Sequence, residues 1–286
     1  MTSIDQLIVE GAWNVYSVSP LYKFVHDKDV LATDAMALVA YLRTSNGELH
    51  SNQSISVSVR SKKDLALFSI HEQLVGGPRR LGGFMYYTPN ADTSTMKTRT
   101  DVLLLQGNEQ LVGQVCAWMQ YQYQCVVALH AVNVNSISME LFAYNLYQNM
   151  LAASDSLDHA PLKLTLHSEN SGKPVQSVTI SIPWKDILAS QQSLAAAANE
   201  GTRRSTLTAP ESERLIRGFI TKYFVNLPVE MSSYRLYSVS SDDCILENIG
   251  RIQFFTPSTV PSVLDAVLQL FVSQNVICPE VEEMTF

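Results

Sequence analysis

Residues 12–24 read AWNVYSVSPLYKF, a pattern that predicts a strand running into a turn. Larger and smaller side chains alternate from Ala12 to Val18, which is the period of two that a β-strand requires. Trp13 and Val15 fall on one face, which we expect to be packed, and Tyr16 falls on the other. Pro20 has no backbone N–H to donate, so it ends the ladder.

Further strand and helix patterns follow along the chain. Strands are indicated by alternation or short apolar runs, and helices by apolar residues three and four apart. The predicted strands are 54–60, 65–70, 83–88, 101–106, 125–131, 162–167, 175–182, 233–239 and 245–255. The predicted helices are 29–43, 111–119, 139–150, 183–199, 215–223 and 260–271. Antiparallel strands interleaved with helices predict an α+β fold.

The polar stretch 152–161 is the best candidate for a boundary inside the chain. We therefore expect an N-terminal α+β half over 1–151 and a C-terminal, partner-binding α+β half over 162–286. The segment GGPRRLGG at 76–83 carries two glycine pairs, a proline and two arginines, and it predicts a flexible basic hairpin loop.

Charged residues are scarce. They make up 16% of the 286 residues, against roughly 25% in an average soluble domain, and the net charge is −7. Burial of surface in a complex is the simplest way to tolerate so few charges. No apolar run approaches the ~20 residues of a membrane-spanning helix, and residues 1–10 lack a signal-peptide pattern. The four cysteines form no CxxC pair, so we expect reduced thiols in the cytosol or nucleus.

Positive charge is concentrated in two basic islands, residues 60–99 with a net charge of +4 and residues 200–239 with +2. Basic islands on an acidic chain are more often a solvated face or a docking site for an acidic partner than a groove for nucleic acid.

Catalytic motifs are not found. Gly77 and Gly82 have the spacing of a phosphate loop, but Gly83 and Phe84 follow where that loop needs Lys and Ser or Thr. There is no GxSxG, no HExxH and no His/Cys spacing typical of zinc. The sequence therefore indicates no enzyme, no metal and no cofactor.

Residues 13–24 resemble the W-x-x-Y-x-V-x-P-L-Y-x-F signature near the start of the centromere protein L family. The matching residues are Trp13, Tyr16, Val18, Pro20, Leu21, Tyr22 and Phe24. Residues 101–147 are similar to the family in their order of a short strand, a Trp-containing helix, a strand and a second helix. Residues 211–274 resemble its closing helix–strand–strand–helix.

The resemblance implies a non-enzymatic structural subunit of the inner kinetochore, the constitutive centromere-associated network. Such a protein lies in the nucleus at the centromere and supports chromosome segregation in mitosis. It pairs with a centromere protein N-like subunit through its C-terminal region, meets other inner-kinetochore proteins, and lies close to centromeric DNA or the nucleosome. Fungal relatives also self-associate, which leaves a homodimer open. The family fold is α+β, with curved antiparallel sheets and helices on their outer faces.

Carried onto this chain, the resemblance makes strands 233–239 and 245–255 the partner edge. The basic islands would face DNA or an acidic partner. The expected partner-edge residues are Tyr234, Leu236, Tyr237, Ile252, Phe254 and Phe255. The expected basic contact residues, chosen by charge, are Lys62, Lys63, Arg79, Arg80, Arg203 and Arg204.

Two other functions stay open at this point. One is a stand-alone, sequence-independent DNA-binding clamp, whose phosphate contacts would make binding sensitive to salt. The other is an unrecognised enzyme, for which convergent polar groups in a deep pocket would be needed.

Overall fold

The computed structural model describes residues 4–45, 54–74, 76–89, 101–152, 160–168, 177–190, 209–225 and 233–273. These residues form two compact units, the first ending at Val132 and the second beginning at Asn133. Both units combine antiparallel strands with helices, so the predicted α+β class is confirmed. The division falls some way before the predicted boundary at 152–161.

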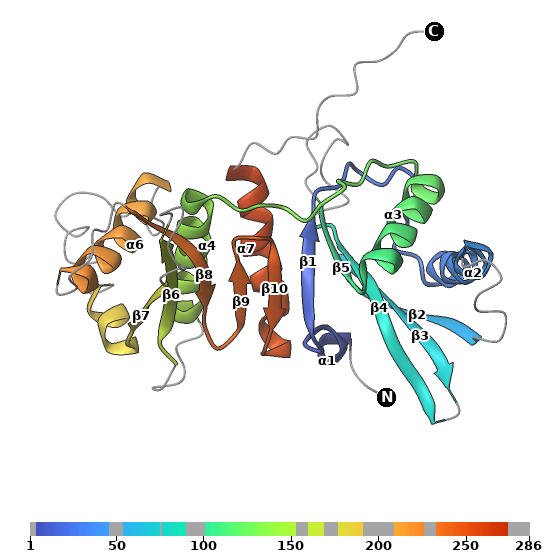
Figure 1. Ribbon diagram of the computed structural model, residues 1–286, viewed down its shortest axis with the longest axis horizontal. Helices are drawn as coiled ribbons and strands as arrows, with labels where there is room; N and C mark the ends of the chain where they lie inside the picture. The colour runs from blue at the N-terminus through green and yellow to red at the C-terminus, as the bar shows by residue number, and fades with distance from the viewer. Residues whose placement is uncertain are drawn as a thin grey trace, which may run out of the picture. The chain divides into compact units, whose positions relative to one another are not determined.

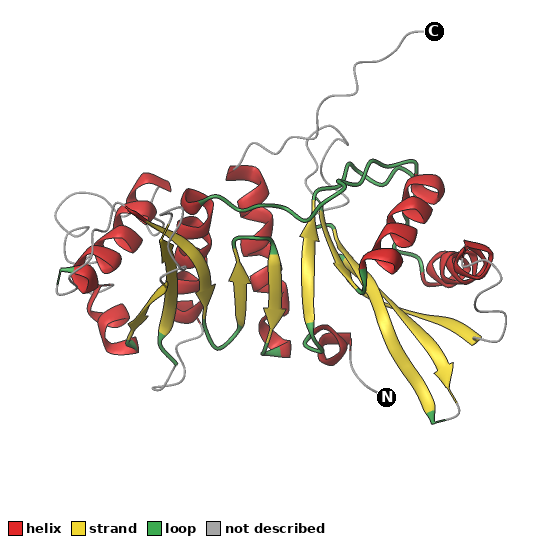
Figure 2. Ribbon diagram, in the orientation of Figure 1, coloured by secondary structure: helices red, strands yellow, loops and turns green. Residues whose placement is uncertain are grey.

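The first unit is, over its described residues, a five-stranded antiparallel arrangement with helices packed against it (Figures 1 and 2). Its elements are α1 (Ile4–Ile8), β1 (Ala12–Tyr16), α2 (Lys28–Ser45), β2 (Ser54–Lys62), β3 (Leu65–Leu74), β4 (Gly77–Tyr87), β5 (Val102–Gln106) and α3 (Glu109–Tyr123). The strand order is β2-β3-β4-β5-β1, with every neighbouring pair antiparallel. β2 therefore lies at one end of this order.

The two long helices of the first unit form where the sequence predicts them. α2 buries a stripe that includes Leu31, Leu38 and Leu42, at the spacing of successive helical turns. α3 begins after Asn108, whose side chain accepts a hydrogen bond from the backbone N–H of Leu111 at 2.8 Å. Both helices pack on the same hydrophobic core, formed on one face of the strands.

The second unit also has five antiparallel strands among its described residues. Its elements are α4 (Ser136–Ala152), β6 (Leu162–Ser168), β7 (Ser177–Ile182), a helical segment at 184–190, α6 (Ala209–Phe224), β8 (Tyr234–Ser240), β9 (Cys244–Glu247), β10 (Arg251–Phe254), a 3₁₀ turn (Pro257–Thr259) and α7 (Val260–Ser273). The strand order is β10-β9-β8-β6-β7.

α4 explains why the division differs from the predicted one. The helix contacts α6, α7 and β8, all of which lie in the second unit. It buries Met139, Phe142 and Leu146 on one side and Tyr147 on another, so it is packed over much of its circumference. A helix that is apolar on several sides is stable only when other elements surround it. The predicted N-terminal half, 1–151, instead included nearly all of this helix.

Three predicted segments differ in the structure. The predicted basic loop at 76–83 is wrong for most of its length, because β4 begins at Gly77 and pairs with β3. Residues 125–131 contain only one isolated bridge, between Val18 and Val127, rather than a strand. The predicted strand 245–255 is two strands, β9 and β10, separated by a turn in which Gly250 has a φ of 74°.

Other predicted segments lie wholly or partly outside the described residues. They are the boundary stretch 152–161, the start of the strand predicted over 175–182 and the end of the helix predicted over 183–199. Within the described parts of the chain, none of the helices combines the length and the hydropathy needed to cross a membrane.

Candidate functional site

Two of the predicted basic contact residues bind the N-terminal segment of the chain. Lys62 Nζ lies 2.8 Å from the Asp5 carboxylate of α1. Arg80 Nη1 donates to the Leu7 carbonyl at 2.9 Å and lies 3.4 Å from the Glu10 carboxylate. These contacts attach residues 5–10 to β2 and β4. Lys62 and Arg80 therefore act first as anchors for α1.

Arg80 is the less accessible of the two cations. Its side chain is 17% exposed, and its guanidinium carbon lies 5.4 Å from the centre of the Trp13 ring. Burial lowers the pKa of Arg80, and the Glu10 carboxylate partly opposes this effect. Nε and Nη2 of Arg80 are buried and have no hydrogen-bond partner among the described residues. His71 stands opposite Arg80 in the β3–β4 ladder, and burial, followed by the Arg80 charge, lowers the pKa of His71.

Lys63 and Arg79 are exposed, but they lie at opposite ends of β3. Lys63 occupies the turn between β2 and β3 with a positive φ of 49°, and Arg79 pairs with Glu72 near the start of β4. Glu72 lies nine residues after Lys63, which separates the two cations by about 30 Å at the rise of an extended strand. The first basic island is thus spread along a hairpin. Arg203 and Arg204 lie outside the described residues.

Two cations of the second unit form ion pairs with acidic side chains. Arg217 Nε lies 3.0 Å from Glu140, whose side chain is only 7% exposed. Lys222 Nζ lies 2.8 Å from Asp186, and the Tyr223 hydroxyl donates to the same carboxylate at 2.9 Å. These two hydrogen bonds lower the pKa of Asp186. Both ion pairs connect α6 to its neighbours.

The motif at 13–24 builds the core of the first unit. Trp13 is fully buried, and its indole N–H donates to the Ile8 carbonyl at 2.8 Å. Tyr16, Val18 and Leu21 belong to the core beneath α2 and α3. Phe24 packs edge-to-face on the rings of His26, Tyr86 and Tyr123, with ring centres 4.7 to 5.4 Å apart. Pro20 is half-buried in the turn, and Tyr22 is 59% exposed.

The predicted partner edge does not match the strand order. β8 pairs with β6 on one side and β9 on the other, so it is not an edge strand. Its Tyr234 and Leu236 are buried, and its Tyr237 is half-buried. The β10 residues Ile252 and Phe254 are also buried. Only Phe255, just beyond β10, is 45% exposed.

The strand at the other end of this unit's strand order is β7, which is not one of the predicted partner-edge strands. Its sequence SVTISI contains no charge and no proline, and among the described strands only β6 pairs with it. Ser177, Thr179 and Ser181 are exposed, while Ile180 and Ile182 are buried. An edge strand without charged residues is open to pairing with another chain. The signal in the sequence was the absence of charge within an alternating run.

The described residues contain no group of three or more His, Cys, Asp or Glu side chains placed to hold a metal ion. Burial raises the pKa values of Cys116 and Cys125 to about 11, which keeps both thiols protonated near neutral pH. The buried Asp34 of α2 accepts hydrogen bonds from Gln122 and Tyr123 of α3, each at 2.9 Å. This polar contact connects the two helices.

Comparison of the chain with protein-family models and with curated proteins finds no match.

Proposed function

We propose that this chain is a non-enzymatic structural subunit of the inner kinetochore, similar to centromere protein L. It pairs with a centromere protein N-like subunit and supports kinetochore assembly on centromeric chromatin. The observation that carries the proposal is the motif at 13–24, in which every matching side chain except Tyr22 is buried or half-buried in the first unit. The α+β architecture agrees with the fold that the resemblance implies. The scarcity of charge agrees with a protein whose surfaces are covered by partners.

In finer detail, we propose that the sheets are curved and that two separate surfaces make the contacts, one with the protein partner and one with DNA or an acidic partner. We assign the partner contact to the second unit, with the open side of β7 as the pairing edge and Phe255 as an exposed apolar contact. Main-chain hydrogen bonds to an edge strand give affinity, and the alternate side chains give specificity. DNA or an acidic partner would meet the exposed cations Lys63 and Arg79.

Replacing Thr179 and Ser181 with lysine should abolish pairing with a centromere protein N-like subunit. Both side chains are exposed, so the fold is retained, while two charges on an edge strand oppose the addition of a further strand. Co-expression and pull-down measure the pairing. In dividing cells, the tagged wild-type chain should mark centromeres and the T179K/S181K variant should not.

Thr165→Lys is the matched control. Thr165 is paired with Thr179 across the ladder, but it lies on β6, which has a strand on each side. This variant should keep its partner and its place at centromeres. A wild-type chain that recovers no kinetochore proteins and misses centromeres would refute the proposed function, whereas equal losses in both variants would refute the role of β7.

The double variant Lys63→Glu/Arg79→Glu should bind duplex DNA more weakly than the wild type. Loss of two phosphate contacts should reduce the slope of log affinity against log salt by about 2. The control is Lys23→Glu/Lys28→Glu, which makes the same change in net charge at exposed positions outside the basic island. Salt titrations by fluorescence anisotropy measure both slopes, and an equal decrease in the two variants would show that net charge alone is responsible.

A further inference from the structure

The strands of the second unit have one covered face and one open face. Along β6, Leu162, Leu164 and Leu166 are buried, and the residues between them are exposed or half-buried. This alternation is typical of antiparallel strands with a core on one side and solvent on the other. Among the described residues, the open face consists of Lys163, Thr165 and His167 of β6, Ser177, Thr179 and Ser181 of β7, Arg235, Tyr237 and Ser240 of β8, Ile245 and Glu247 of β9, and Arg251 and Gln253 of β10.

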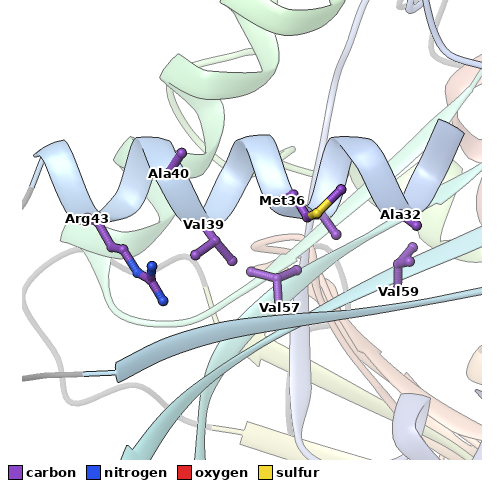
Figure 3. A pocket seen from close by; sticks show the side chains of 8 residues that line it. Ala32, Met36, Val39, Ala40, Arg43, Val57 and Val59 are labelled. Carbon is purple, nitrogen blue, oxygen red and sulfur yellow. The ribbon is translucent and has the colours of Figure 1, made fainter. Parts of the chain in front are cut away.

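The strands of the first unit are more fully covered. β3, β4 and β5 each contain four or more successive buried residues, so both of their sides are packed. At β2, Val57 and Val59 point toward α2 across a shallow apolar groove of about 380 Å³ (Figure 3). Arg43, the charged residue of this lining, donates to the Ile55 carbonyl at 3.1 Å and is therefore already bonded. Among the described residues, a polar face that spans five strands is thus found in the second unit.

Two aromatic rings stack on the open face. The ring centres of His167 and Tyr237 are 3.8 Å apart, and their planes differ by 12°. Tyr237 is the extra residue of β8 at a register shift opposite β6, and such a bulge changes the direction of a side chain. On its other side His167 is paired with Ser177 of β7, whose side chain is too small to cover a ring. A further planar ring can therefore continue the stack above β7.

Three exposed cations lie on the same face, although they come from separate parts of the sequence. Arg235 is paired with His167 across the ladder, and Lys163 precedes His167 by four residues, about 13 Å along β6. Arg251 begins β10 and is the only Lys or Arg in residues 240–286, so a charge count along this acidic segment does not reveal it. The open face has one acidic member. It is therefore positive on a chain whose net charge is −7.

Hydroxyl side chains lie beside the stacked rings. Ser177, Thr179 and Ser181 are exposed on β7, and the Thr179 hydroxyl is 3.2 Å from that of Thr165 on β6. A hydroxyl group both donates and accepts hydrogen bonds, which matches the 2′-hydroxyl group of a ribose. The open face therefore combines a ring stack, cations and hydroxyls on neighbouring strands.

We propose that the open face binds single-stranded RNA, with a base on the His167–Tyr237 stack, phosphates at the cations and ribose at the β7 hydroxyls. A base of a single strand is able to stack on a protein ring, whereas the bases of a duplex already stack on one another. An acidic peptide would use the cations alone and leave the ring stack without a role. The inference concerns other residues and another nucleic acid than the contact at Lys63 and Arg79, so it goes beyond the proposed function.

The wild-type protein should bind a fluorescein-labelled oligouridine of ~10 nucleotides, measured by fluorescence anisotropy. The matching deoxyuridine oligomer should bind at least about threefold more weakly, because it lacks the 2′-hydroxyl groups. Unlabelled duplex DNA of the same length should not displace the RNA, because its bases are not available to the rings.

Two variants separate the stack from the cations. Tyr237→Leu removes one ring without changing the charge, so it should raise the Kd for the RNA about tenfold and leave the slope of log affinity against log salt unchanged. Lys163→Gln/Arg251→Gln keeps the rings. It should reduce this slope by about 1.4, as expected for two lost phosphate contacts on a single strand.

The matched controls are Tyr121→Leu and Lys23→Gln/Lys28→Gln, at exposed positions of the first unit, and both should bind the RNA as the wild type does. Circular dichroism checks that all variants are folded. A wild type that does not bind the RNA below ~100 µM would overturn the proposal. So would equal losses in the test and control variants, or displacement of the RNA by the duplex.

Thr179→Ala/Ser181→Ala tests the part of the hydroxyls. This variant should lose the preference for the oligouridine over the deoxyuridine oligomer, and a wild type without that preference would overturn the assignment to RNA. The substitutions place no charge on β7, so they leave its pairing with a partner strand intact. None of these outcomes bears on the kinetochore function proposed above.

Discussion

Replacing Trp13 with alanine should lower the free energy of unfolding of the first unit by about 4 kcal/mol, the range typical of a buried Trp-to-Ala change. The side chain is fully buried, so its removal leaves a large cavity. The change also removes the indole N–H that bonds to the Ile8 carbonyl and the ring beneath the Arg80 guanidinium. Each of these losses loosens the attachment of α1. Urea denaturation followed by circular dichroism measures the effect.

Tyr22→Ala is the control within the same motif. Tyr22 matches the signature as Trp13 does, but its side chain is 59% exposed, so its removal should change stability by less than about 0.5 kcal/mol. If the two variants lost similar stability, the assignment of Trp13 to the core and Tyr22 to the surface would be refuted. If Tyr22→Ala instead kept its stability and lost centromere targeting, a surface role for the motif would be indicated.

Replacing Gly83 with alanine should destabilise the first unit by about 3 kcal/mol, at the upper end of overpacking costs. A Cβ at this position would lie 2.1 Å from the Phe68 carbonyl oxygen of β3. This oxygen belongs to the backbone of β3, which has a strand on each side, so the clash cannot be relieved by the movement of a flexible side chain. β3 and β4 must separate instead, which weakens the ladder that carries Arg79 and Arg80.

Gly113→Ala is the opposite case. Gly113 lies exposed in α3, and a Cβ there would meet no atom within 4 Å. Alanine should therefore stabilise the helix by up to about 1 kcal/mol, because glycine loses more backbone entropy on folding. Thermal denaturation should show a lower Tm for G83A and an unchanged or higher Tm for G113A. The same sign for both variants would contradict the packing described here.

The predictions that succeeded depend on local periodicity. β1, α2, α3 and α4 appear where alternation or helical spacing placed them, because each signal lies within a few neighbouring residues. The second part of β4 was predicted as a strand, but its first part was predicted as a loop, since Gly and Pro normally indicate turns. Gly82 and Gly83 instead lie where only glycine allows neighbouring backbone so close. The turn between β9 and β10 was missed because apolar residues continue on both sides of it.

The candidate site was less predictable than the fold. The charge count located Lys62 and Arg80 in a basic island, but their partners Asp5, Leu7 and Glu10 lie 57 to 73 residues away in the sequence. Likewise, the sequence showed that 54–59 and 177–182 alternate without charge, but not that β2 and β7 end their strand orders.

By itself, therefore, the sequence determined the α+β class, the motif at 13–24, the poverty of charge and most of the helices and strands. The tertiary structure alone decided which strands have an open side, which cations anchor α1, and which cations gather on the open face of the second unit. The physical reason is that side-chain periodicity is a local property, whereas burial, strand order and charge pairing depend on residues far apart in the chain.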